Sequence, residues 1–114
     1  MNWYIGVDIG TTNIKAAAYC PDRSDLPNML LHESEPTPKT YPSGTEIYEY
    51  DADALFETCV RVLARLTARL EHPHIRAIAV SSMAESGVLL DRENRPLSTS
   101  IAWFDPRTLP QAEA

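Results

Sequence analysis

A carboxylate at the end of an apolar strand, directly before a glycine-threonine turn, is the feature that most constrains how this sequence folds. The run reads Tyr-Ile-Gly-Val-Asp-Ile-Gly-Thr-Thr-Asn-Ile-Lys over residues 4–15. Side chains of a strand alternate between its two faces, so Asp8 shares a face with Gly6 and Gly10. Because neither glycine has a side chain, the space beside Asp8 is open for a ligand.

The chemistry of this turn suits a phosphate group and a metal ion. Backbone N–H groups of the turn and the hydroxyls of Thr11 and Thr12 can donate to phosphate oxygens. Asp8 offers the carboxylate oxygens that Mg²⁺ prefers, and Lys15 on the returning strand adds a cation. The alternative is a plain β-hairpin whose turn needs Gly10 for its backbone freedom, with Asp8 merely solvated.

The composition narrows the classes of partner. The net charge is −6 and the arginines lie mostly along one segment, so the basic clusters that nucleic-acid binding needs are missing. Cys20 and Cys59 lack metal-binding or disulfide spacing, and we expect free thiols. With no leader pattern and no apolar run of membrane-spanning length, we expect a cytoplasmic protein without a membrane partner. At 114 residues the chain is one domain at most, short for an enzyme with two substrates.

Hydrophobic periodicity predicts an α/β fold with a mixed sheet that begins with a β-hairpin and is covered by a helix. The expected elements are the hairpin over residues 4–19, strands near 29–33 and over 75–80, 88–91 and 100–104, and a helix over 51–71. The continuous apolar run 75–80 predicts a buried central strand. The segment 36–43 is rich in proline, which favours a surface connection.

The predicted helix has two distinct faces. One apolar stripe, which we expect to face the core, consists of Ala52, Leu55, Phe56, Cys59, Leu63, Leu66 and Leu70. Arg61, Arg65 and Arg69 follow one another at single-turn spacing. We interpret this row as a solvated helix face, with an anion-binding patch as the alternative.

Three blocks of sequence together resemble a known family. They are Asp-Ile-Gly-Thr-Thr-Asn-Ile-Lys at residues 8–15, Ile-Ala-Val-Ser-Ser-Met-Ala-Glu at 78–85, and the segment 96–108, which contains Ile-Ala-Trp-Phe-Asp-Pro-Arg-Thr. In this order they are similar to the FGGY carbohydrate kinases. The resemblance implies a ribonuclease H-like, actin-like ATPase domain. It also implies that residues 1–114 are the N-terminal portion of a kinase's first domain, with a second domain absent.

Kinases of this family transfer the γ-phosphate of ATP to a hydroxyl of a sugar or polyol. The resemblance implies that Asp8 holds Mg²⁺ through water and that Gly10, Thr11, Thr12 and Lys15 form the phosphate side of the ATP site. The family's general base, an aspartate, would lie beyond Ala114, so the isolated chain is expected to be inactive.

The sugar side is implied in the same way. Glu85 matches a glutamate that contacts substrate hydroxyls in the glycerol kinase branch, and Trp103 matches a tryptophan that walls the sugar pocket. Asp105 and Arg107 lie in the loop that follows. Ala84 stands where the glycerol branch has arginine, so the sugar or polyol is left open.

Two alternatives come from other functional classes. Asp8, Glu85 and Asp105 could gather two Mg²⁺ ions in a small ribonuclease H-like nuclease. The chain could also be a vestigial domain kept for interaction, without nucleotide binding. Assembly into a homo-oligomer is open in every case.

Overall fold

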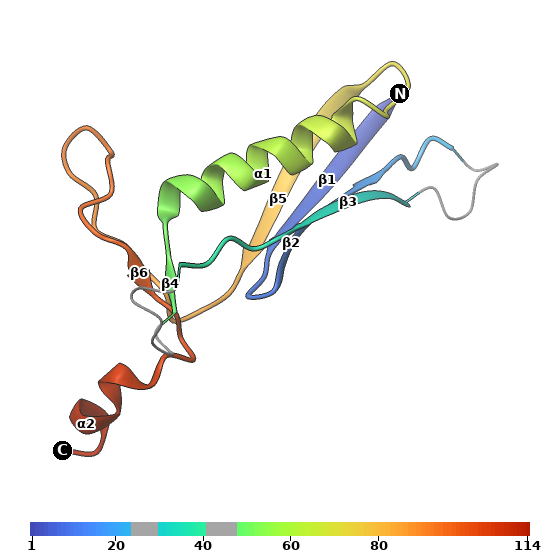
Figure 1. Ribbon diagram of the computed structural model, residues 1–114. Helices are drawn as coiled ribbons and strands as arrows, with labels where there is room; N and C mark the ends of the chain where they lie inside the picture. Colours follow the sequence, from blue (N-terminus) through green and yellow to red (C-terminus); the bar gives the residue numbers. More distant parts are fainter. Residues whose placement is uncertain (24–29, 41–47) are drawn as a thin grey trace. The chain divides into compact units, whose positions relative to one another are not determined.

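The computed structural model of the chain describes residues 1–23, 30–40 and 48–114 (Figure 1). They form two compact units. Unit 1 contains residues 1–37 and 57–83, and unit 2 contains residues 38–56 and 84–114. Within the described residues no helix is long and apolar enough to span a membrane.

Unit 1 is built on a four-stranded mixed sheet with the order β3-β2-β1-β5. The strands are β1 (Asn2–Ile9), β2 (Asn13–Tyr19), β3 (Leu30–Pro36) and β5 (His74–Ser82). β1 pairs antiparallel with β2, β2 pairs antiparallel with β3, and β5 runs parallel to β1. The predicted α/β class, the mixed sheet and the initial hairpin are confirmed.

The two faces of β1 follow the predicted alternation. Trp3, Ile5 and Val7 are buried, whereas Tyr4 and Asp8 are exposed on the opposite face. Burying three large apolar side chains of one strand stabilises the fold through the hydrophobic effect. The alternation therefore fixes which face of the sheet carries the Asp8 carboxylate.

Helix α1 (Ala52–Thr67) begins where Asp51 caps it, because Asp51 Oδ1 accepts the Ala54 N–H at 3.1 Å. Its buried residues are Thr58, Val62 and Leu66. Of the predicted stripe, Leu66 and Leu70 are buried, whereas Phe56 is 69% exposed. The stripe also left out the buried Thr58 and Val62.

The polarity of Thr58 explains why the predicted stripe left this buried residue out. A polar residue was not expected in the core, but its hydroxyl accepts a hydrogen bond from Arg61 Nη2 at 2.9 Å. With that polar atom satisfied, the β-branched side chain can be buried without a large cost.

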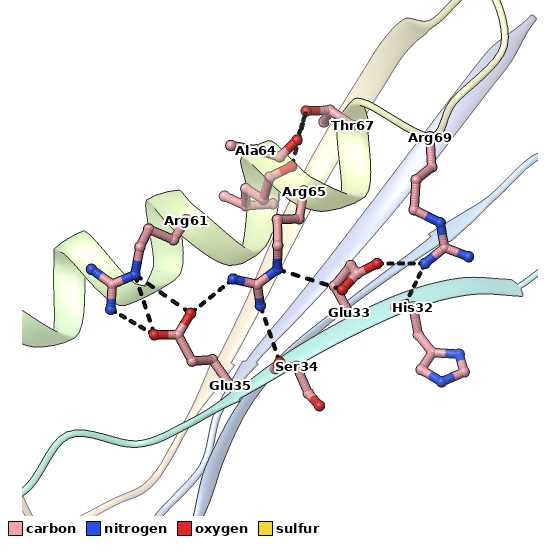
Figure 2. A network of polar contacts seen from close by, with 10 residues as sticks. His32, Glu33, Ser34, Glu35, Arg61, Ala64, Arg65, Thr67 and Arg69 are labelled. Atoms are coloured by element: carbon pink, nitrogen blue, oxygen red, sulfur yellow. Dashed lines mark hydrogen bonds and ion pairs between the residues drawn. The ribbon is translucent and has the colours of Figure 1, made fainter.

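The arginine row binds β3, with Arg61 and Arg65 on α1 and Arg69 just beyond its end (Figure 2). Arg61 pairs with Glu35 at 2.7 Å, Arg65 pairs with both Glu35 at 3.0 Å and Glu33 at 3.5 Å, and Arg69 pairs with Glu33. Hydrogen bonds from Arg69 hold the pKa of Glu33 below its usual value, and those from Arg61 do the same for Glu35. The three arginines are exposed, as the prediction of a solvated face expects. The sequence did not indicate that the same guanidinium groups connect the helix segment to the sheet through Glu33 and Glu35.

The prediction that residues 75–80 form a central buried strand is also wrong for the described residues. Among the described strands, β5 is the last of the sheet order and pairs with β1 alone. Ile78 is 51% exposed and Val80 is 63% exposed. A continuous apolar run indicates a strand that can be covered on both faces, but it does not say which part of the chain covers it.

Unit 2 contains little regular structure. Strands β4 (Glu49–Tyr50) and β6 (Ser100–Ile101) form a two-stranded antiparallel sheet, followed by the 3₁₀ turn η2 (Pro106–Thr108) and helix α2 (Leu109–Ala112). The extended piece expected over 100–104 is thus limited to its first two residues.

The strand predicted over 88–91 is absent from the described residues of unit 2. Only an isolated bridge joins Leu90 to Pro96. The Asp91 carboxylate accepts the backbone N–H groups of Glu93 and Arg95, both at 2.9 Å, so the chain turns there. The turn covers residues 92–94. Of the proline-rich segment 36–43, residues 41–43 lie outside the described residues.

The observed register of α1 predicts a clear contrast in stability. Val62 is fully buried, and we expect Val62→Ala to lower the free energy of unfolding by about 2 kcal/mol through lost burial and a small cavity. Phe56→Ala, on the exposed side, should change it by less than about 0.5 kcal/mol. Urea unfolding of both variants measures the difference. A larger loss for Phe56→Ala than for Val62→Ala would contradict the register.

Candidate functional site

The Asp8 carboxylate lies in a polar row that crosses the sheet of unit 1. Lys15 is its cross-strand partner on β2, Ser34 follows on β3, and Ser81 is its partner on β5. The Ser81 hydroxyl donates to Asp8 Oδ1 at 3.1 Å, which orients the carboxylate. Asp8, Lys15 and Ser81 line one groove of about 710 Å³.

The turn after β1 depends on glycine at position 10. Gly10 donates its N–H to the Asn13 carbonyl at 3.0 Å, and a Cβ atom there would lie 2.7 Å from that same oxygen. No larger residue fits without moving the backbone. The turn is thus too tight for any residue with a side chain at position 10.

Thr37 holds this turn from the end of β3. Its hydroxyl donates to the Gly10 carbonyl at 2.6 Å, its N–H donates to the Thr12 carbonyl at 2.9 Å, and it is 5% exposed. Sequence reasoning missed Thr37 and Ser81. Ser81 could have been found as the first of two serines at the end of β5, the strand parallel to β1. No sequence signal marked Thr37, because its role depends on the pairing of β3.

The site in unit 1 suits a metal ion that is held mainly by phosphates and water. Thr12 and Lys15 are exposed beside the single Asp8 carboxylate, and Thr11 is half-buried. The described residues contain no group of three acidic, histidine or cysteine residues that could form a metal cage. One carboxylate is enough for Mg²⁺ that also binds nucleotide phosphates.

In unit 2, Glu85 and Trp103 lie on segments that contact each other. Glu85 is exposed and has a left-handed backbone with φ of 58°. The next residue, Ser86, donates its hydroxyl to the Ile101 carbonyl of β6 at 3.3 Å. Trp103, two residues after Ile101, is 55% exposed and packs edge-on against Phe104. An exposed carboxylate and an exposed aromatic ring are therefore brought to one part of the unit.

Asp105 and Arg107 are engaged with the protein itself. Asp105 is 5% exposed and caps η2 by accepting the Arg107 N–H at 2.9 Å. The Arg107 guanidinium donates to both Asp105 oxygens at 3.0 Å and to Glu49 Oε1 at 2.8 Å. Hydrogen bonds from Arg107 hold the pKa of the Asp105 carboxyl well below its usual range. Glu49 was not anticipated from the sequence.

The predicted site residues thus fall into two groups. Those of the phosphate motif lie in unit 1: Asp8, Gly10, Thr11, Thr12 and Lys15. Those of the expected sugar side lie in unit 2: Glu85, Trp103, Asp105 and Arg107.

The chain is similar to known kinases in sequence. The family model described as the FGGY family of carbohydrate kinases, N-terminal domain, matches residues 3–114. A probable L-xylulose kinase of Pasteurella multocida (strain Pm70) is 32% identical over 111 residues, which are 96% of this chain and 22% of that protein. The chain thus spans about one-fifth of the length of this relative.

The fold is similar to those of solved kinases. Gluconate kinase from Lactobacillus acidophilus superposes with a TM-score of 0.82 at 24% identity, covering 98% of this chain and 22% of that one. Plasmodium falciparum glycerol kinase, solved with ADP, gives 0.79 at 19% identity, covering 99% and 22%. These neighbours have the actin-like ATPase fold. The present chain corresponds to the N-terminal part of that fold.

The family match extends over both units and all three sequence blocks. The match therefore favours a carbohydrate kinase over the ribonuclease H-like nuclease as the origin of Asp8, Glu85 and Asp105. From residue 3 to residue 114, this chain belongs to the FGGY family of carbohydrate kinases.

Proposed function

We propose that the full-length protein transfers the γ-phosphate of ATP to a hydroxyl group of a sugar or polyol. The observation that carries this proposal is the Asp8 carboxylate, oriented by Ser81 beside a turn that accepts only glycine at position 10. The relatives support the acceptor class, because they are named for xylulose, gluconate and glycerol, which all carry several hydroxyl groups.

Unit 1 would bind the phosphate groups of ATP. Backbone N–H groups of the turn, the Thr11 and Thr12 hydroxyls and the Lys15 ammonium group would bind phosphate oxygens. Asp8 would hold Mg²⁺ through water. The metal would neutralise charge on the transferring phosphoryl group.

Unit 2 would bind the sugar or polyol that accepts the phosphate. Glu85 would accept hydrogen bonds from substrate hydroxyls, and the exposed Trp103 ring would pack against the apolar C–H surface of the sugar. We assign no general base within residues 1–114 and expect the aspartate that serves this role further along the full-length chain. A reaction that consumes ATP also fits a cytoplasmic enzyme.

The test of this function is a substrate panel. Full-length protein is mixed with ATP, Mg²⁺ and one of xylulose, gluconate or glycerol, and ADP release is followed. The proposal expects that at least one acceptor raises ADP release far above the rate without acceptor. Equal ADP release with and without every acceptor would contradict it, and the complete absence of ADP release would favour the vestigial domain.

Glu85→Ala should weaken acceptor binding selectively. Losing a hydrogen bond to a charged group costs about 1.5–3 kcal/mol, so we expect the acceptor KM to rise about 10- to 100-fold. The KM for ATP should stay nearly unchanged. Steady-state kinetics with separate acceptor and ATP titrations measure both constants.

Glu93→Ala is the matched control for Glu85→Ala. Glu93 is another exposed loop glutamate of unit 2, and it pairs with Arg95 on the surface. Its removal should leave both KM values unchanged. If Glu85→Ala changed the KM for ATP alone, Glu85 would have no place in the acceptor site.

A further inference from the structure

A guanidinium group joined to two carboxylates fixes the end of unit 2 that carries Trp103. Arg107 donates through Nη1 to Glu49 Oε1 at 2.8 Å, and through Nε and Nη2 to the two Asp105 oxygens at 3.0 Å. The Asp105 side chain is fully buried, and that of Glu49 is 17% exposed. These three residues are called the 49–105–107 cluster below.

The carboxylate oxygens of the cluster accept hydrogen bonds from other groups of the protein. Glu49 Oε2 accepts the Thr99 hydroxyl at 2.8 Å, and Asp105 Oδ2 also accepts the Tyr48 N–H at 2.9 Å. Three of the five N–H groups of Arg107 are used for the two carboxylates. Bidentate arginine–carboxylate pairs of this kind fix geometry as well as charge.

The cluster fixes both ends of the turn in which Trp103 lies. The Asp105 N–H donates to the Ala102 carbonyl at 3.0 Å, and the Ala102 N–H donates to the Tyr48 carbonyl at 3.1 Å. The Tyr48 ring packs against Phe104 with centroids 4.9 Å apart. The backbone that carries the Trp103 ring, and the Phe104 ring against which it packs, are thus both held in place within unit 2.

We infer that Glu49 is a positioning residue that acts through Arg107 and Asp105 to orient Trp103 toward the acceptor. Asp105 and Arg107 then belong to the same support and do not touch the acceptor themselves. This inference rests on the proposed function, since it takes Trp103 as a wall of the acceptor site. It adds Glu49 as a determinant of which acceptor is preferred.

The expected effect follows from the geometry. Glu49→Ala removes the acceptor of Arg107 Nη1 and of the Thr99 hydroxyl, so the Trp103 turn is held less firmly. A displacement of about 1 Å at a positioned group can cost about 100-fold in rate. We expect the acceptor KM to rise about 10-fold, the ratio of kcat/KM between two acceptors to change, and the ATP KM to stay constant. Glu49→Gln, which keeps the shape and one acceptor oxygen, should restore part of the loss.

A double-mutant cycle in the full-length protein tests whether Glu49 acts through Trp103. If it does, Glu49→Ala should raise the acceptor KM in the wild type but have little further effect in Trp103→Ala, because contacting residues are not additive. Additive losses, or an unchanged acceptor KM in Glu49→Ala, would overturn the inference. Urea unfolding checks each variant, and Glu49→Gln takes the place of Glu49→Ala in the cycle if the latter does not fold.

Wild-type turnover separates this inference from the proposed function. If the wild type phosphorylates an acceptor and the losses are additive, only the positioning role of Glu49 fails. If the wild type phosphorylates no acceptor, the proposed function fails first and the inference fails with it.

Discussion

Asp8→Asn in the full-length protein is expected to lower kcat for phosphoryl transfer by about 100-fold or more, as removal of a preorganised electrostatic group does in other enzymes. Asparagine keeps the shape of the side chain and can still accept the Ser81 hydroxyl. It loses the negative charge that Mg²⁺ requires. The acceptor KM should change by less than about twofold, because Asp8 is assigned to the metal and the phosphates and not to the acceptor.

Separate titrations of ATP, acceptor and Mg²⁺ measure this effect, with Asp53→Asn as the matched control. Asp53 is an exposed aspartate in the first turn of α1 and has no proposed role in the site. Asp53→Asn should have wild-type kinetics. Near-normal turnover in Asp8→Asn, or a loss confined to the acceptor KM, would contradict the assignment of Asp8 to the phosphate side.

Residues 1–114 expressed alone are expected to show no phosphoryl transfer to any acceptor. In-line transfer needs two substrates, Mg²⁺ and a base near the attacking hydroxyl. The proposed site residues supply one phosphate-side carboxylate and part of an acceptor wall, and the chain spans 22% of the length of its xylulose kinase relative. ATP held through its phosphates alone should bind with a Kd near 1 mM, or about −4 kcal/mol.

An ATP–acceptor assay on residues 1–114 tests this second prediction. Asp8→Asn in the same 114 residues serves as the control for contaminating kinase. Turnover that disappears in Asp8→Asn would show that these residues, alone or self-associated, provide a base and an adenosine site. The assignment of the base to a later part of the full-length chain would then be wrong.

The parts of the fold that depend on local pattern could be predicted from the sequence. Alternation along residues 4–9 correctly indicated which face of β1 carries Asp8, and the change to helical period located α1. The turn at Gly10 could also be recognised, because a glycine between a carboxylate and two threonines is a local signal.

The parts of the fold and of the site that depend on residues far away in the sequence could not be predicted. The arginine row of α1 looks like any solvated face until β3 places Glu33 and Glu35 opposite it. Thr58 is buried with its hydroxyl bonded to Arg61, and hydrophobic periodicity does not count a threonine as a core residue. Glu49 is separated from Arg107 by 58 residues, so no spacing rule could pair them.

The destination of the γ-phosphate tests the central claim most directly. The actin-like fold alone does not determine whether the phosphate passes to water or to an alcohol. Full-length protein is incubated with ATP labelled in the γ-phosphate, Mg²⁺ and the acceptor from the panel, and the labelled products are separated. The account predicts one labelled sugar or polyol phosphate for each ADP released. Label found only in inorganic phosphate, at the same rate with and without acceptor, would contradict it.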